Sequence, residues 1–462
     1  MISAKVYRLT YCQGCLEKQQ VIDRLREENV RLKAKLRYQE RTAKEGPFGS
    51  STPSAKVPLK ANSAPENSQR RGGAKPGHQG HGRHGVSDDE ITSQETVPAP
   101  ERCPYCGGPL DPKGSKMRTI IEVEPVHKEV IRYELEQRDC CRCNRTFTAR
   151  PAGVFAKGLF GNRLLTHLAV EHYVQGVTMG HLSAQLGLGQ GSLWAALHQL
   201  ARRLASVPER LCLEYRQAPV KHADETGWRD DGHNGYAWIF CTERITLFRF
   251  RQTRAASVAQ EVFGTKRLPG TLVVDRYNGY NQVLCAIQYC YAHLSREVED
   301  LEKEFPEVGE VSLFVASFAP LLADAMKLRS KELGPAVFRQ QAHKLKTQIQ
   351  KVVQAPARHP GVQKIQDIFR EKAARLYHWA KSPTIPADNN RAERELRPLV
   401  IARKISFGSQ SEQGAKTREI LMSVLHTLRK RTSDLFGAFK RALDALAEDE
   451  ERDPYRELFD SS

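Results

Sequence analysis

The chain has 462 residues, which is too long for one hydrophobic core and predicts about three domains. Its net charge of +17 favours a polyanionic partner, most often nucleic acid, over a basic surface that serves only solubility. No run of about 18 apolar residues and no apolar signal core occur, so we expect a cytoplasmic protein without membrane spans. The eleven cysteines then indicate thiols or metal ligands rather than disulfides.

Residues 1–43 contain a predicted helix with a heptad pattern over 16–39. The a and d positions alternate through Ile22, Leu25, Asn29, Leu32 and Leu36. Because Asn at a single a position fixes the register of a parallel dimer, we predict a dimeric coiled coil. The alternative is an amphipathic helix that packs on its own chain. Cys12 and Cys15 precede the helix, and we interpret them as free thiols or a weak metal site.

Residues 44–100 differ in composition from the rest of the chain. They are rich in Gly, Ser, Pro, Lys and Arg and contain almost nothing to bury. This composition predicts a flexible basic linker. Such a linker either contacts DNA phosphates without reading sequence or serves as a passive tether.

Residues 101–150 contain the strongest local motif, two CxxC pairs. The four cysteines are Cys103, Cys106, Cys140 and Cys143. Two such pairs place four thiolates around one tetrahedral Zn²⁺ ion, so we predict a structural zinc ribbon. The intervening residues, Met117–Arg138, alternate like two strands.

Residues 151–215 are predicted to be helical and to resemble a helix-turn-helix. A short helix leads to a turn containing Gly187, and a second helix begins near Ser192, which is a candidate N-cap. If that second helix enters the major groove, Gln190 and Ser192, with Trp194 nearby, lie close to DNA. The alternative is a plain helical hairpin.

The stretch Val220–Trp228, VKHADETGW, predicts a short strand with a polar tip that ends at Gly227. A carboxylate at the end of a strand is often functional, and an acidic turn is the alternative interpretation. Because successive side chains of a strand point to opposite faces, Asp224 and Glu225 cannot share one site. We favour Asp224 as the functional residue.

A predicted hairpin over GYAWIFCTERITLFRFR follows, then a helix at about 255–264 and a buried strand at Leu272–Val274 with Asp275 at its end. We further expect a helix at roughly 279–286 and a strand over IQYCYAHL. This order of elements is that of a ribonuclease H-like α/β sheet. In that order Asp224 and Asp275 lie side by side. Two adjacent carboxylates require a cation, and oxygen ligands suit Mg²⁺ or Mn²⁺.

Residues 297–385 are predicted to form a helical insertion within a catalytic domain that spans 216–415. After the insertion, Asp388 and Asn389 are natural caps for a basic helix. That helix carries the predicted DNA contacts Arg391 and Arg394, and also Glu393, Glu395 and Arg397. Residues 416–462 are expected to form one more helix, at about 416–448, and an acidic tail.

Glu393 supplies a third carboxylate for the metal site. The alternative is a surface ion pair between Glu393 and Arg397, which are four residues apart. Glu395 lies about 200° further around the helix from Glu393, so only one of the two glutamates can face the sheet.

Together these motifs resemble the IS66-family transposases, a DDE group of insertion-sequence enzymes. The resemblance rests on the heptad helix, PFGSS, KPGHQGH, the four-cysteine ribbon, DET, VVDRYNGY, YAH, and DNNRAERELRP with ARKISFGS, over about residues 16–415. It implies a DDE triad at Asp224, Asp275 and Glu393, and it places a family histidine at His293. The chain departs from the family pattern in LSRE after His293 and in the C-terminus from about Leu421.

The resulting hypothesis is Mg²⁺- or Mn²⁺-dependent phosphoryl transfer on double-stranded DNA, with terminal repeats and target as substrates. We expect a homodimer or larger assembly, a nucleoid-associated location, and accessory proteins encoded by the element as candidate partners. Two rival hypotheses are a catalytically inactive DNA-binding regulator and a nuclease of the same fold without strand transfer.

Overall fold

The computed structural model describes residues 151–460 except Lys157, most of 17–32, residues 128–135, and the backbone of two short strands before residue 149. The predicted linker, 44–100, lies outside the described residues, as do Cys12, Cys15, Cys103, Cys106 and Cys143. Every element named below belongs to one compact unit, which includes residues 131–462.

The described residues within 17–32 are helical, as the heptad pattern predicts, and Ile22 and Leu25 are exposed. Residues 128–135 have no regular structure, so the predicted pair of strands over Met117–Arg138 is wrong in this part. Instead, β1 (Gln137–Cys140) and β2 (Arg145–Thr148) pair antiparallel on either side of residues 141–144.

A helical segment precedes the main sheet. It comprises α2 (Asn162–Val170), the π-helical η3 (Glu171–Gln175), α3 (Met179–Leu186), α4 (Gln190–Arg203) and α5 (Val207–Gln217). Gly187 ends α3 in the left-handed region at φ 61°, as the turn prediction requires. The N-cap of α4 is Gly189 and not Ser192, because the helix begins two residues earlier than expected.

The main sheet has five strands in the order β5-β4-β3-β6-β7. Their bounds are β3 (Val220–Asp230), β4 (His233–Cys241), β5 (Thr246–Arg251), β6 (Thr271–Val274) and β7 (Ala286–Tyr289). Neighbours in the β3–β4–β5 half are antiparallel, and β6 and β7 run parallel to β3. Asp224 lies mid-strand and not at a polar tip, because β3 stays paired with β4 as far as Asp230.

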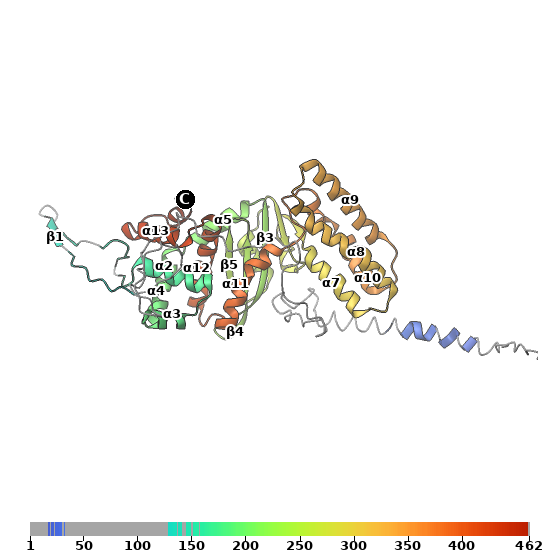
Figure 1. Ribbon diagram of the computed structural model, residues 1–462, viewed down its shortest axis with the longest axis horizontal. Helices are drawn as coiled ribbons and strands as arrows, with labels where there is room; N and C mark the ends of the chain where they lie inside the picture. Colours follow the sequence, from blue (N-terminus) through green and yellow to red (C-terminus); the bar gives the residue numbers. More distant parts are fainter. Residues whose placement is uncertain are drawn as a thin grey trace, which may run out of the picture. The chain divides into compact units, whose positions relative to one another are not determined.

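Helices cover both faces of this sheet (Figure 1). On one face α11 (Asn390–Ser406) contacts β3 and β4. On the other face α6 (Ala256–Phe263) packs with α5, and Phe240 of β4 meets Phe263 of α6 edge to face. The helix predicted at 279–286 is only the 3-10 turn η4 (Asn278–Tyr280).

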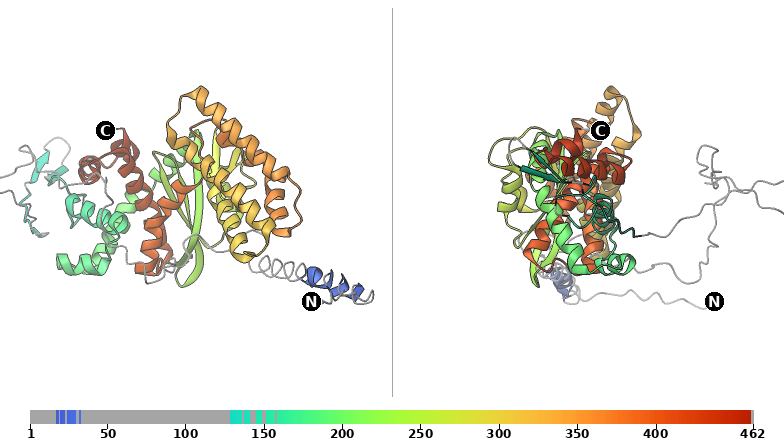
Figure 2. Two further views of the ribbon diagram at one scale, coloured as in Figure 1. Left: turned by 45° about the vertical axis from the view of Figure 1, so that its right-hand side comes forward. Right: turned by 90° about the vertical axis from the view of Figure 1, so that its left-hand side faces the viewer.

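A group of four helices follows β7 (Figure 2). These are α7 (Tyr291–Glu304), α8 (Gly309–Leu328), α9 (Pro335–Gln354) and α10 (Pro360–Glu371), with three short 3-10 turns after α8 and α10. The helical insertion therefore begins at Tyr291, and the strand predicted over IQYCYAHL ends at Tyr289, so that His293 lies on a helix.

One described helical stretch, Gly309–Lys331, is long and apolar enough to cross a membrane by length and composition alone. Its buried side chains recur with helical spacing along one face of α8, as at Val311, Phe314 and Phe318. That helix packs against α7 and α9. These contacts are those of a core helix in a helical group.

The C-terminal segment is three helices and not one helix with an acidic tail. They are α12 (Glu412–Arg431), α13 (Leu435–Glu448) and α14 (Pro454–Phe459). Asp434 caps α13 by accepting the Gly437 N–H, and Leu458 and Phe459 of α14 are buried. The acidic stretch is therefore the connection into a packed last helix.

Helix α12 closes the free edge of the sheet at β5. The backbone N–H groups of Thr246, Phe248 and Phe250 donate to side chains of α12. The acceptors are Thr427 (3.0 Å), Ser423 (3.0 Å) and Glu419 (3.2 Å). Four residues of helix and two residues of strand span similar lengths, about 6 Å, so the two series stay in register. Side chains of α12 thus pair backbone groups that an edge strand would otherwise leave unbonded.

Candidate active site

Asp224 lies where β3 extends past its parallel neighbour β6. The last paired residues are His222 and Val273, so Asp224 and Asp275 each lie two residues further on. The Asp224 carboxylate is 7% exposed. Its Oδ1 accepts the Glu225 N–H at 2.9 Å, whereas Oδ2 is buried and has no hydrogen-bond partner among the described residues.

Asp275 follows β6 directly, at the point where the chain leaves the sheet. Its Oδ1 accepts the Tyr277 N–H at 2.9 Å, which fixes the turn that leads into η4. Asp275 is half-buried. Because neighbouring parallel strands point residues at the same register to the same side of the sheet, we expect its side chain on the same side as that of Asp224.

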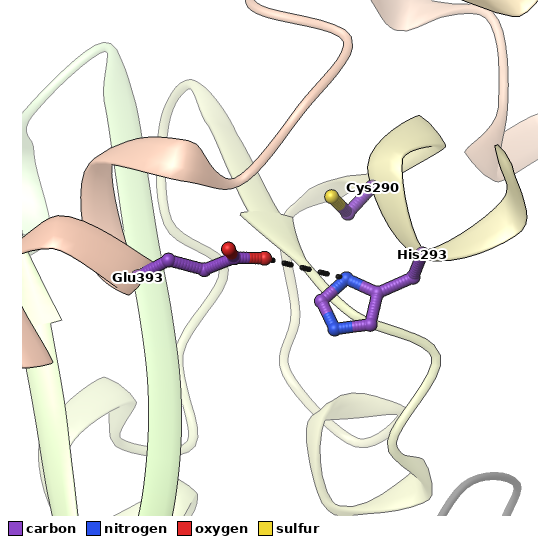
Figure 3. Close-up of side chains that lie close together, drawn as sticks. All are labelled: Cys290, His293 and Glu393. Atoms are coloured by element: carbon purple, nitrogen blue, oxygen red, sulfur yellow. Dashed lines mark ion pairs between the residues drawn. The ribbon is translucent and has the colours of Figure 1, made fainter. Parts of the chain in front are cut away.

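Glu393 occupies the first turn of α11 and approaches α7. Arg296 donates to both of its carboxylate oxygens at 3.2 Å. His293 Nδ1 lies 3.8 Å from Glu393 Oε1, as Figure 3 shows. Cys290, His293 and Glu393 offer ligand atoms that all lie within 4.8 Å of one another, which makes them a candidate metal cluster.

The start of α11 is fixed to β3 by Asn389. Its Nδ2 donates to the Ala223 carbonyl at 2.9 Å, and its Oδ1 accepts from His222 Nδ1 at 2.9 Å. Asn389 is therefore the N-cap residue by position, but its side chain joins two elements instead of capping the helix; Asp388 accepts the Asn390 N–H. This bond pair brings Glu393 to the strand that carries Asp224.

Electrostatics make the cluster a candidate cation site. Burial raises the pKa of Asp224 well above its ordinary range, and repulsion from Glu225, Asp275 and Glu393 raises it further. Burial lowers the pKa of His293, against attraction by Asp275. Carboxylates that repel one another, with one buried oxygen left without a partner, are stabilised by a bound cation.

The chemistry of the donors favours a hard cation on the carboxylates. Burial raises the pKa of Cys290 to about 12, so this thiol stays protonated at neutral pH. Its Sγ also accepts the Asn389 N–H at 3.1 Å. Because Mg²⁺ and Mn²⁺ prefer oxygen ligands, the carboxylates fit such an ion and Cys290 does not.

Glu225 and Glu395 have other partners. Glu225 points to the opposite face of β3, where Arg254 donates to Oε1 (2.9 and 2.5 Å) and Tyr280 donates to Oε2 at 2.6 Å. Burial and then Asp275 raise the pKa of Glu225 to about 7, against Arg254. Glu395 pairs with Lys430 at 2.8 Å. Glu225 is still close enough to the cluster for its charge to raise the pKa of Asp224.

The residues predicted to contact DNA lie in two places. Gln190 and Ser192 are exposed in the first turn of α4, where Trp194 is half-buried. On α11, Arg394 is exposed and Arg391 is half-buried. Of the zinc-site cysteines, the structure describes only Cys140, by its backbone at the end of β1.

Sequence reasoning missed Arg296 and Asn389 as positioning residues. Arg296 belongs to the LSRE stretch after His293, which differs from the family pattern, and its charge partner lies 97 residues away. Asn389 was recognised only as a helix cap. A capping residue one helical turn before the candidate ligand Glu393 was the available signal for its role.

With this geometry in place, comparison with known proteins decides the family. The model of the transposase IS66 family matches residues 157–417. The chain belongs to the IS66 transposase family. The matched range contains Asp224, Asp275 and Glu393 and excludes the segment with the four predicted zinc ligands. Family membership indicates a nucleic-acid-processing enzyme with DNA as its partner.

Two proteins from Sinorhizobium fredii (strain NBRC 101917 / NGR234) are similar in sequence to this chain. The uncharacterized protein y4qI is 23% identical over 377 residues, which cover 73% of this chain and 67% of the relative. The uncharacterized protein y4jD is 22% identical over 403 residues, which cover 76% of this chain and 75% of the relative. The similarity therefore extends beyond the matched family domain.

Proposed function

We propose that this chain is a DDE transposase that binds the ends of its insertion sequence and performs metal-dependent DNA cleavage and strand transfer. The main support is the buried Asp224 Oδ2, which has no hydrogen-bond partner among the described residues. Three further carboxylates, those of Glu225, Asp275 and Glu393, repel the same side chain. The strand order, with one antiparallel and one parallel half, supports a ribonuclease H-like core within residues 216–415.

In this proposal Asp224, Asp275 and Glu393 hold Mg²⁺ or Mn²⁺. When bound, such ions activate a water or a freed 3′-hydroxyl and stabilise the leaving oxygen of an in-line displacement. Arg296 keeps the Glu393 carboxylate in place through two hydrogen bonds. No Ser or Tyr nucleophile is required, because water or DNA supplies the attacking oxygen.

The remaining parts of the chain serve DNA binding and assembly in the same proposal. Residues 101–150 would hold Zn²⁺ through the two CxxC pairs. The helical segment at 151–215 and the arginines of α11 would contact DNA, and the heptad helix would join two copies of the chain. The active assembly at the transposon ends would be a homodimer or a larger complex, together with accessory proteins of the element.

A strand-transfer assay with a labelled transposon end and a supercoiled target tests the proposal. Asp224→Ala and Glu393→Ala should lose metal-dependent cleavage by about 10³-fold or more and keep end binding. The matched control is Glu395→Gln, which changes a carboxylate on the same helix outside the cluster and should keep cleavage. Full activity in either alanine variant would contradict the assignment.

The same assay separates the rival functions. An inactive DNA-binding regulator would bind ends in a salt-sensitive way and show no Mg²⁺-dependent nicking in the unmodified chain. A nuclease without transposition would cleave the labelled end and leave the supercoiled target unjoined. The proposal predicts both cleavage and joined product.

A further inference from the structure

A cavity of about 480 Å³ lies away from the carboxylate cluster. Its walls come from η3, the start of α4, the C-terminal end of α11 and the start of α12. None of Asp224, Asp275 and Glu393 lines it. The volume is typical of sites that hold a small molecule or one monomer of a polymer.

Arg418 of α12 is the unusual group in this cavity. Its side chain is buried, and no carboxylate of the described residues forms an ion pair with it. It contacts His172 Nε2 at 3.4 Å and Met422 Sδ at 4.0 Å. It also lies over two aromatic rings, those of Tyr173 at 5.3 Å and Trp228 at 5.5 Å. The other buried arginine of the core, Arg249, is paired with three glutamates. A guanidinium stays charged in proteins, so Arg418 is a buried cation that lacks an anion.

Tyr173 supplies a second unsatisfied group at the same place. Its side chain is 3% exposed, it lines the cavity, and its hydroxyl has no hydrogen-bond partner among the described residues. Buried hydroxyls in proteins are nearly always bonded. Among the described residues, this hydroxyl has no acceptor and the guanidinium has no anion. Because both groups lie at one cavity, they indicate that a ligand supplies an anionic acceptor there.

The neighbouring histidine does not supply that acceptor as an anion. His172 Nδ1 donates to the Val177 carbonyl at 2.8 Å, so its Nε2 presents a lone pair toward Arg418. Burial and Arg418 lower the pKa of His172 to about 4, which keeps the ring neutral. The positive charge of Arg418 therefore remains available to a ligand.

The rest of the cavity wall is mostly apolar, with polar side chains such as Gln190, Ser409 and Gln410 among its lining. Trp194 stacks on His198 at a centroid distance of 6.1 Å and lines the cavity with Val177, Met179 and Ile405. The first turn of α12 also lines it, through Ser411 and Gly414, and the N-terminus of this 20-residue helix favours negative charge. The cavity thus fits a ligand with one anionic group and a flat, mostly apolar body.

We propose that this cavity binds one nucleotide unit, with its base against Trp194 and its phosphate on Arg418 and Tyr173. Base stacking on aromatic rings and phosphate binding by arginine are the usual means of holding single-stranded nucleotides. We assign the nucleotide to DNA, which rests on the proposed function; a free mononucleotide has the same chemistry. The exposed Gln190 and Ser192 lie within one turn of Trp194 on α4, and Gln190 also lines the cavity.

Photocrosslinking with 5-iodouracil tests the site in the full-length chain. The Asp224→Ala background is used so that DNA is not consumed and the outcome does not depend on the catalytic assignment. The probes are free 5-iodo-dUMP, the nucleoside 5-iododeoxyuridine, and transposon-end DNA with 5-iodouracil at successive end positions. Crosslinked peptides are identified by mass spectrometry. We expect crosslinks at Trp194 or Tyr173, with at least 10-fold higher yield for the nucleotide than for the nucleoside.

Tyr173→Phe is the decisive variant, because it removes only a hydroxyl that has no protein partner. We expect a several-fold lower crosslinking yield and an unchanged thermal midpoint, whereas a structural role for the hydroxyl would lower the midpoint. Arg418→Met should abolish the preference for nucleotide over nucleoside.

The two nucleotide sources give different results. Crosslinks from one position of the DNA assign the occupant to DNA and support the proposal in full, whereas crosslinks from 5-iodo-dUMP alone overturn that assignment. Absence of crosslinks at both aromatic residues with every probe, or equal yields from nucleotide and nucleoside, would overturn the site itself.

Discussion

Asp224 carries the least satisfied charge of the candidate site. Its side chain is buried, and one carboxylate oxygen has no hydrogen-bond partner among the described residues. The neighbours whose charge shifts its pKa are all carboxylates. A carboxyl whose pKa is raised on folding stabilises the folded state fully only below its unfolded pKa. This contribution is lost as the pH rises through the raised folded pKa. At neutral pH without metal, Asp224 therefore destabilises the fold.

Asp224→Asn should consequently raise the free energy of unfolding in EDTA at pH 7 by about 1–3 kcal/mol while abolishing cleavage. Urea denaturation measures the first effect. Glu393→Gln is the matched control, since Arg296 already offsets the charge of Glu393 and no gain is expected. Addition of Mg²⁺ should stabilise the unmodified chain and not Asp224→Asn. A less stable Asp224→Asn variant would refute this account.

A second single-residue effect concerns His426, which we expect to lower the stability of the fold in acid. Its ring is fully buried, Nε2 donates to the Tyr173 carbonyl at 3.1 Å, and Nδ1 accepts from Arg429 at 3.3 Å. Burial and Arg429 lower its pKa from 6.5 to about 4. The unfolded chain therefore takes up this proton first as the pH falls, and stability is lost between pH 6.5 and about 4.

At about 1.4 kcal/mol per pKa unit, the full loss is roughly 3 kcal/mol. His426→Gln should lower stability at pH 7 but should reduce the difference in unfolding free energy between pH 7 and pH 4.5 by about 2 kcal/mol. Urea titrations at the two pH values give this difference. An equal pH dependence in both proteins would show that His426 is not responsible.

At the scale of elements, the pairing between α12 and β5 predicts a specific weakness. Thr427 Oγ1 accepts the Thr246 N–H at 3.0 Å and donates to the Thr246 carbonyl at 3.0 Å. Thr427→Val keeps the shape and leaves both backbone groups buried without a partner, which should cost about 1–3 kcal/mol. Chemical denaturation measures the loss. Thr427→Ser restores the hydroxyl and should recover most of the stability; no recovery would assign the effect to packing.

Asn389 likewise links a helix to a strand through side-chain hydrogen bonds, here at the candidate site. It joins α11 to β3 across 167 residues of sequence through His222. The other polar link between this helix and β3 among the described residues comes from Arg403, near the far end of α11, which donates to Thr226 Oγ1 at 3.0 Å. The local pattern of the chain shows a capping residue, and only the packed elements show what that residue holds together.

At the scale of the molecule, the net charge of +17 predicts DNA binding that weakens steeply with salt. Each phosphate contact contributes about −0.9 to the slope of log K against log salt concentration. Arg394→Gln removes one exposed cation of α11 and should reduce the magnitude of that slope by about one, measured by fluorescence anisotropy with end DNA. An unchanged slope would place Arg394 outside the DNA interface.

Much of the fold could be predicted because its patterns are local. The β4–β5 hairpin, the buried β6 with Asp275 after it, the turn at Gly187 and the start of α11 near Asn389 all follow from residue periodicity and from turn and cap residues. The strand order then brought Asp224 and Asp275 together without any knowledge of side-chain contacts. Local sequence also identified the family, through DET and DNNRAER.

The tertiary structure alone decided how far β3 runs, that His293 lies on a helix, and that α12 pairs with the sheet edge. It also revealed Arg296 beside Glu393 and the unpaired Arg418 in its cavity. The physical reason is common to all of these. Periodicity reports the local path of the backbone, whereas pairing, burial and charge compensation depend on partners that lie far away along the chain.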